Sequence, residues 1–143
     1  MNKLTSRIIL FNRNKEILIL KDKDSNYRGL PGGGIKISES PIEGLRKEIK
    51  EEISIDSPFS LKLVGAEYRQ DNKNSEVILV FYGGVLSNSD IAKIKPANEI
   101  GEAKFINTAE AFKLLTPSMT RRLKLILPNI TKGIVYLENG KKV

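Results

Sequence analysis

The sequence contains no cysteine and no histidine. Without cysteine the chain has no disulfide, no thiolate nucleophile and no zinc–thiolate site. Without histidine it has no Ser–His or Cys–His nucleophilic pair and no histidine metal site. Any acid–base or metal chemistry must therefore rest on carboxylate, tyrosine or lysine side chains.

Long apolar runs are absent as well. No run approaches the ~18 residues of a membrane-spanning helix, and the first residues lead into a strand pattern without a signal-like segment. We therefore expect a soluble, cytoplasmic protein with no membrane partner. The 143 residues, 40% of them hydrophobic, suffice for one core, and we expect a single domain over residues 1–143.

The chain carries a formal net charge of +7, with a pI near 9.6. Such an excess favours anionic partners, including nucleotides. The sequence has no arginine-rich arm and no basic stripe with regular aromatics, which disfavours specific nucleic-acid binding and leaves it as a secondary alternative. Most of the excess is expected to be solvated surface.

One stretch, residues 30–55, combines a glycine turn with an acidic helix and reads LPGGGIKISESPIEGLRKEIKEEISI. Three consecutive glycines, Gly32 to Gly34, indicate positive φ or close approach of another group. Residues 35–37 resemble a short strand. Ser40, three residues before Glu43, forms a capping box and Pro41 suits the first helical position, so a helix is predicted to begin near Pro41.

On that helix the carboxylates lie beside the apolar stripe and not opposite to it. The stripe comprises Ile42, Leu45, Ile49 and Ile53, and Glu48, Glu51 and Glu52 form a second stripe roughly a quarter turn away. Carboxylates at these spacings repel one another unless a cation is bound, and oxygen ligands suit Mg²⁺ or Mn²⁺. Gly44, on the glutamate side, is interpreted as room for a ligand. The alternative is a solvated acidic face.

The stretch resembles the signature of the Nudix hydrolase family, which begins with glycine and glutamate and continues through an Arg-Glu helix. Gly33 and Glu39 match the opening pair, and Glu48, Ile49, Glu51, Glu52 and Ile55 match later positions. Lys47 stands at the arginine position and Ser54 at the second glycine position. Lys47 is expected to supply charge to Glu51 but no bidentate fork. Ser54 replaces a left-handed helix terminator, so we expect a slightly strained or reshaped loop there.

The resemblance implies an α/β (α+β) fold, a Nudix-type α/β/α sandwich with a mixed β-sheet. It also implies that Glu48, Glu51 and Glu52 are catalytic and bind Mg²⁺, with Mn²⁺ as an alternative, and that Gly33 contributes backbone to the metal site. Glu51 is the predicted proton acceptor, with Glu99 or Glu102 as alternatives.

The predicted substrate-binding residues lie partly outside the signature, and they are Arg7, Arg28, Gly34 and Glu99. In family members a basic residue at the position of Arg7 can reach substrate phosphates. Arg7 could equally lie on an exposed strand face.

Patterning outside the signature predicts strands at residues 4–11, 16–20, 60–70, 77–86 and 102–106, then helices at 107–115 and 116–127 and a strand at 134–137. The polar segment 87–100 is expected to be a loop with at most a helical turn. Tyr68 and Tyr82 could stack a base, although buried tyrosines in a sheet are commoner.

These observations predict a metal-dependent hydrolase of a phosphoanhydride bond in a nucleoside diphosphate linked to another group, most simply a nucleoside triphosphate or similar small nucleotide. One alternative is a non-catalytic nucleotide- or RNA-binding module, and another is an RNA 5′-end pyrophosphohydrolase. The glycines match neither a P-loop nor a dinucleotide fingerprint. The family resemblance leaves a homodimer as an option.

Overall fold

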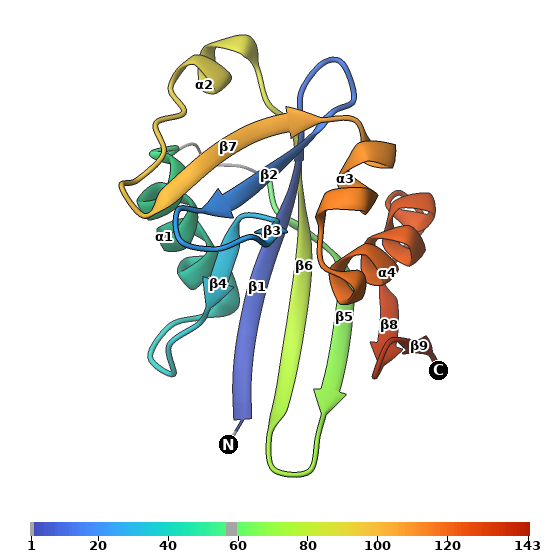
Figure 1. Ribbon diagram of the computed structural model, residues 1–143. Helices are drawn as coiled ribbons and strands as arrows, with labels where there is room; N and C mark the ends of the chain where they lie inside the picture. The colour runs from blue at the N-terminus through green and yellow to red at the C-terminus, as the bar shows by residue number, and fades with distance from the viewer. Residues whose placement is uncertain (1, 57–59) are drawn as a thin grey trace.

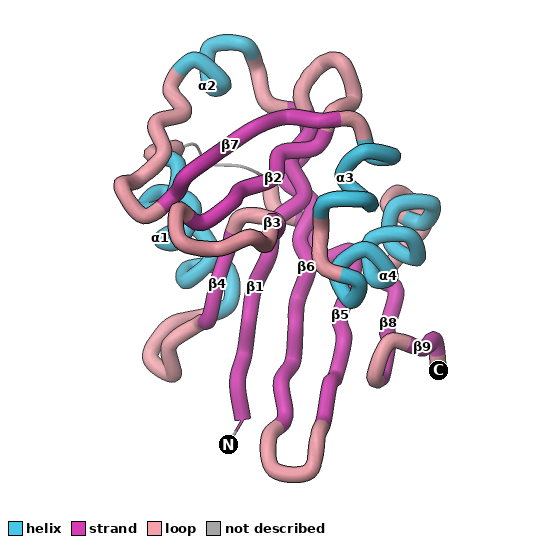
Figure 2. The backbone as a smooth tube through the Cα atoms, viewed as in Figure 1, coloured by secondary structure: helices cyan, strands magenta, loops and turns pink. Residues whose placement is uncertain are grey.

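The computed structural model describes residues 2–56 and 60–143, in which a mixed sheet lies between helices (Figures 1 and 2). The strand order is β3-β2-β1-β6-β5-β8-β9, with β4 paired to β1 and β7 paired to β2. The strands are β1 (Asn2–Phe11), β2 (Ile17–Asp22), β3 (Arg28–Gly29), β4 (Gly32–Gly34), β5 (Lys62–Gln70), β6 (Ser75–Val85), β7 (Ile100–Ile106), β8 (Val135–Glu138) and β9 (Lys141–Lys142).

Helix α1 (Pro41–Ile53) covers one face of the sheet, and α3 (Thr108–Leu114) and α4 (Pro117–Ile126) cover the other (Figure 1). Two shorter segments, α2 (Asn88–Ala92) and the 3₁₀ turn η1 (Leu127–Asn129), complete the helices. Alternation along β1 separates two cores: Ile8 and Leu10 pack in the cluster with Leu45 of α1, whereas Ile9 packs in the cluster with Leu123 of α4. The expected α+β fold with a mixed sheet between helices is confirmed.

Strand β1 changes neighbours along its length, and this change places the functional site. Its upper end meets β2 through the pair Phe11↔Ile17, while its middle pairs with the glycine strand β4 from Thr5↔Gly34 to Arg7↔Gly32. On its other side β1 runs parallel to β6. The backbone of Gly32 therefore lies beside Arg7 at the point where β1 separates from β2.

The predicted strand at residues 35–37 is wrong, because the pairing segment is Gly32–Gly34 itself. The amide of Ile35 still donates to the Leu4 carbonyl at 2.8 Å, and the chain then turns before Ser40. Glycines disfavour a strand on propensity alone, so tertiary pairing with β1 overrides that preference.

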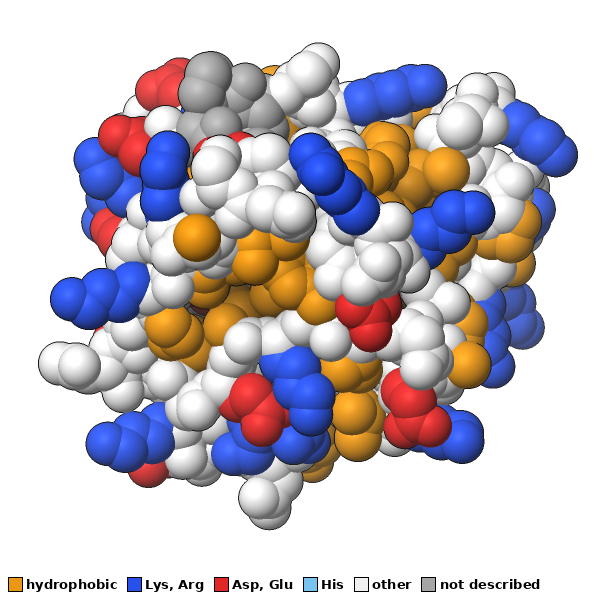
Figure 3. Space-filling model, turned by 90° about the horizontal axis from the view of Figure 1, so that it is seen from above, with side chains coloured by type: hydrophobic (Ala, Val, Ile, Leu, Met, Phe, Trp, Pro, Cys, Tyr) orange, Lys and Arg blue, Asp and Glu red, His pale blue; other side chains and the backbone are white. Residues whose placement is uncertain are grey.

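Most of the remaining elements follow the sequence pattern, whereas the short strands β3 and β9 were not predicted. The hairpin of β5 and β6, the helical turn α2 and the start of α4 at Pro117 behind the Thr116 cap are all present. No helix in the described part of the chain is long and apolar enough to cross a membrane. On the face seen from above, Lys and Arg side chains are dispersed and interspersed with acidic ones (Figure 3).

Candidate active site

The carboxylates of α1 are positioned by local sequence signals. The Ser40 Oγ accepts the Glu43 amide at 3.1 Å, which caps the helix, and Leu45, Ile49 and Ile53 are buried against the sheet. Ile42, predicted in the same apolar stripe, is 40% exposed. It lies in the first turn, and the buried apolar contacts of the helix begin at Leu45.

Glu52 reaches the glycine strand directly. Its Oε1 accepts a hydrogen bond from the Gly32 amide at 2.9 Å. Gly32 has φ of 133°, and a Cβ there would lie 2.1 Å from the Ser6 carbonyl oxygen, so only glycine can present this amide. Burial raises the pKa of the Glu52 carboxyl to about 7, although the Gly32 amide and the Arg7 guanidinium act in the opposite direction.

Glu48 lies one helical turn before Glu52, and its carboxylate lies beside Gly33, the glycine after Gly32. A Cβ on Gly33 would lie 3.1 Å from the Glu48 carboxylate, so the glycine leaves room for this side chain. Burial, followed by the negative charge of Glu51, raises the pKa of Glu48. Gly33 and Glu48, both predicted as metal-site residues, are thus in close approach.

Glu51 is exposed on the same helix. Among the described residues no three carboxylates converge into a ready-made metal site. The side chains of Glu48, Glu51 and Glu52 nevertheless offer only oxygen ligands. The charge of Glu51 disfavours ionisation of Glu48, and a divalent cation would relieve this repulsion between the two carboxylates. In donor chemistry the three glutamates therefore fit Mg²⁺ or Mn²⁺.

Arg7 lies in the site and not on an exposed strand face. Its Nη1 donates to the carbonyl oxygens of Leu30 and Gly32 at 3.0 and 3.1 Å. Burial lowers the pKa of the guanidinium, while the charge of Glu52 raises it. Arg7 thus fixes the strand whose amide binds Glu52, and it places a positive charge beside that carboxylate.

Arg7 and Glu52 open onto a cleft of about 300 Å³. Arg28, predicted to bind substrate, lines this cleft, and its Nε contacts the Glu102 carboxylate at 3.3 Å. The lining residues are Arg7, Leu20, Asp22, Ser25, Tyr27, Arg28, Gly29, Leu30, Gly32, Glu52, Thr116 and Met119. Of the two further acids proposed from the sequence, Glu102 therefore borders the cleft through Arg28.

Gly34 and Glu99, also predicted to bind substrate, are not among the lining residues. Gly34 lies beside the Lys3 side chain, and Glu99 is exposed, with its carbonyl accepting the Lys23 amide at 2.8 Å. The sequence prediction did not include Thr116 and Met119 from α4. The sequence pattern indicated that a helix starts at Thr116, but it could not indicate that this helix packs beside β3.

The structure settles two local interpretations of the signature. Lys47 forms its ion pair with Glu39, at 3.6 Å, and its charge also acts on Glu51, as predicted. Gly44 is buried against Ile35, whose Cδ1 would lie 2.6 Å from an added Cβ, so the space is filled by this side chain and not by a ligand.

Ser54 retains the left-handed conformation, with φ of 65°. Its Oγ donates to the Lys95 carbonyl at 2.9 Å. The expected strain at this residue is therefore present, while the helix still terminates in the usual left-handed turn.

Comparison with known proteins places this geometry in a family. The family model of the NUDIX domain matches residues 1–128. A Bacillus subtilis (strain 168) protein, provisionally named an 8-oxo-dGTP diphosphatase, is 26% identical over 116 residues, covering 81% of this chain and 74% of its own. An RNA pyrophosphohydrolase of Marinomonas sp. (strain MWYL1) is 38% identical over 58 residues, 41% of this chain and only 35% of that relative.

Among solved structures, the MutT protein of Methanosarcina mazei Go1 superposes with a TM-score of 0.75 at 19% identity, covering 92% of this chain and 96% of that one. The likeness establishes the fold. The domain match across residues 1–128 establishes the family, whose hydrolases generally use divalent metals and act on small nucleotides. The chain belongs to the Nudix hydrolases and is an enzyme of the pyrophosphohydrolase type.

Proposed function

We propose that this enzyme hydrolyses a phosphoanhydride bond in a nucleoside diphosphate linked to another group, with a nucleoside triphosphate or similar small nucleotide as substrate. The observation that carries the proposal is the meeting of Arg7 and Glu52 at Gly32, on the wall of the 300 Å³ cleft. A cation for phosphate and a carboxylate of the acidic helix thus face one cleft.

The lining of the cleft offers groups that suit both the phosphates and the base of a nucleotide. Arg7 and Arg28 provide guanidinium donors for phosphate oxygens. Tyr27 and Met119 provide aromatic and thioether surface for a base. Tyr27 is 70% exposed and therefore accessible to a ligand.

Glu48, Glu51 and Glu52 are the proposed ligands of Mg²⁺, or of Mn²⁺, together with the Gly33 backbone. When bound, such an ion neutralises phosphate charge and lowers the pKa of an attacking water. Glu51 is the proposed proton acceptor, because its exposed carboxylate can return the proton to solvent. Arg7 holds Leu30 and Gly32 in place, which keeps the Gly32 amide directed at Glu52.

The test is a substrate panel with Mg²⁺ or Mn²⁺, comprising nucleoside triphosphates, oxidised nucleoside triphosphates, dinucleotides and nucleotide sugars. Release of pyrophosphate or phosphate from a small nucleotide is the expected result. The names of two relatives justify including 8-oxo-dGTP and 5′-triphosphorylated RNA. Absence of release from every substrate would favour a non-catalytic nucleotide- or RNA-binding module, which the retained glutamates disfavour.

RNA 5′-end hydrolysis is the second candidate, supported by the local similarity to the Marinomonas RNA pyrophosphohydrolase. It predicts a higher kcat/KM on triphosphorylated RNA than on the free nucleotide. A cytoplasmic location, a single domain over residues 1–143 and a homodimer stay predictions, and gel filtration tests the last.

A further inference from the structure

The sheet face beneath α4 carries a buried ion pair that the proposed mechanism does not use. Glu67 of β5 is 1% exposed and Arg122 of α4 is 5% exposed. Arg122 Nε donates to Glu67 Oε1 at 2.7 Å, between residues that are 55 positions apart in the sequence. The other buried residues of α4, Leu123 and Ile126, are apolar. The ion pair is thus a polar tether between α4 and the sheet.

This tether is incompletely hydrogen bonded. Glu67 Oε2 accepts no hydrogen bond from the residues that the structure describes, and Arg69 Nη1 stays 3.7 Å away from it. Charges removed from water lose solvation, and apolar residues of comparable size often stabilise such a site equally well or better. Stability alone therefore does not account for a charged pair at this place.

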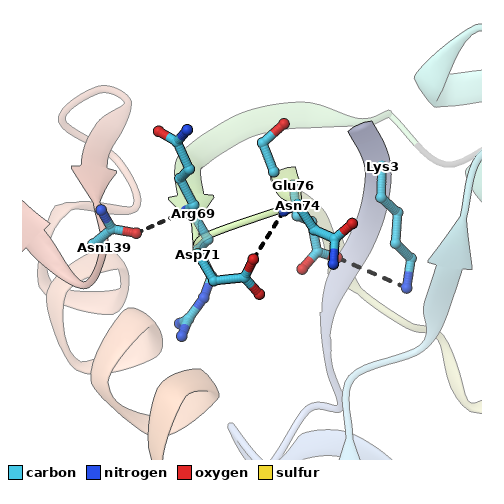
Figure 4. A pocket seen from close by; sticks show the side chains of 8 residues that line it. Lys3, Arg69, Asp71, Asn74, Glu76 and Asn139 are labelled. Carbon is cyan, nitrogen blue, oxygen red and sulfur yellow. Dashed lines mark hydrogen bonds and ion pairs between the residues drawn. The ribbon is translucent and has the colours of Figure 1, made fainter. Parts of the chain in front are cut away.

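Arg69 belongs to a different environment. It lines a polar pocket of about 370 Å³ beside the β5–β6 hairpin, together with a second cation, Lys3 (Figure 4). Two acids of the same pocket, Asp71 and Glu76, offset this positive charge. The pocket thus carries no excess charge that would call for a ligand, and the interaction that distinguishes this part of the sheet is the tether.

Helix α4 connects the tether to the cleft. Met119 precedes Arg122 by three residues, which places the two side chains on the same side of the helix. Met119 lines the cleft, and its Cε would lie 3.5 Å from a Cβ added to Gly29. Thr116, which caps the helix, lines the cleft as well. A displacement of Arg122 relative to the sheet would therefore displace one wall of the cleft.

Arg7 projects from the same face of the sheet as Glu67. The strand register pairs Arg7 with Val80, and Val80 with Gly65, two residues before Glu67. Directly paired residues of neighbouring strands share a face, as do residues two apart on one strand. Burial lowers the pKa of Arg7, and the positive charge of Arg122 acts in the same direction. Glu67 therefore holds and offsets a second guanidinium whose charge reaches the phosphate-binding arginine.

We propose that the bond from Arg122 to Glu67 sets the position of α4 over the sheet, so that Arg122 is a positioning residue for substrate binding. The Glu52 carboxylate and Arg7 are held at Gly32 by separate contacts. Loss of the tether should therefore weaken binding at the wall formed by Met119 more than it slows bond cleavage. The kinetic part of this inference rests on the proposed function, whereas the structural part does not.

The test replaces the tether by apolar residues, Glu67→Leu together with Arg122→Met, which removes one charge of each sign. Urea unfolding should show a stability equal to or above that of wild type. With the best substrate of the panel, KM should rise about tenfold, as for one lost contact in a binding pocket, while kcat stays within about twofold. A double variant that does not fold would show that the pair serves stability and would overturn the proposal.

A second measurement does not require hydrolysis. The sequence has two methionines, at positions 1 and 119, so ¹³C-methyl labelling of methionine reports Met119 by its own NMR signal. Met119→Leu assigns this signal by removing it. We expect one sharp Met119 signal in wild type and a shifted or broadened one in the double variant. If no nucleotide is hydrolysed, the proposed function fails, but this signal still tests the tether.

Ile126→Val is the matched control, because Ile126 packs from the same helix against Gly65 of the same strand. It should lower the stability by removing buried apolar contact, and it should leave both KM and the Met119 signal unchanged. An equal rise of KM in this control would overturn the proposal, since KM would then follow helix packing in general. An unchanged Met119 signal in the folded double variant would also overturn it, whatever its KM, because the wall would not have moved.

Discussion

The Gly32 amide donates to Glu52 Oε1 at 2.9 Å, and this bond joins the glycine strand to the acidic helix. Arg7 Nη1 donates a second hydrogen bond to the carbonyl oxygen of the same glycine. Both peptide groups of one glycine are thereby engaged, which explains how a short strand without side chains is held in place. The relative placement of strand and helix follows from these contacts.

Replacement of Glu52 by Gln tests the catalytic assignment. The amide keeps a side-chain oxygen for the Gly32 N–H, so the fold should be retained, whereas a metal-binding and charged oxygen is lost. We expect kcat to fall by about 10²-fold or more. The measurement is steady-state hydrolysis of the best substrate from the panel, with circular dichroism to verify folding. Glu43→Gln, an exposed position in the first turn of the same helix, is the control and should keep full activity.

Stability should depend on pH through Glu52. Its folded pKa of about 7 lies above the ordinary value of 4.5, so the native state binds the proton more tightly than the unfolded state. The resulting stabilisation is complete below the unfolded pKa and is lost as pH rises through 4.5 to about 7. Urea unfolding in the presence of a chelator should therefore show a steeper loss of unfolding free energy between pH 5 and 8 in wild type than in Glu52→Gln. Identical slopes in the two proteins would contradict the raised pKa.

Ser54 offers a test of strain against hydrogen bonding at the end of α1. Ser54→Ala keeps the left-handed strain and removes the bond to Lys95, so it should cost about 0.5–1 kcal/mol of unfolding free energy. Ser54→Gly removes the same bond but relieves about 1 kcal/mol of strain, so it should lie near wild type. Urea unfolding of the three proteins gives the order. A glycine variant less stable than the alanine variant would show that strain is unimportant here.

Local signals were sufficient for the parts of the fold that depend on nearby residues. The Ser40 cap, the start at Pro41 and the burial of Leu45 follow from spacing along the chain. The contact between Gly44 and Ile35 could not be predicted from the sequence. A helical wheel shows the direction in which Gly44 points but not which residue packs there, and Ile35 is brought to that place by the turn after β4. Thr116 and Met119 reach the cleft by packing of a helix distant in sequence, which periodicity does not encode.

Gly44→Ala distinguishes the packing interpretation from the ligand-space interpretation. Alanine favours the helix by about 1 kcal/mol, but its Cβ would lie 2.6 Å from Ile35 Cδ1 and 3.0 Å from Cγ2. Overpacking of this kind costs about 1–3 kcal/mol, so unfolding free energy should fall slightly and kcat should be retained. Ile35→Val removes the Cδ1 atom, so it should cost less in the Gly44→Ala background than in wild type. Urea unfolding of the four proteins measures this coupling. Additive stabilities together with lost hydrolysis would instead mean that the space beside Gly44 is needed by a ligand.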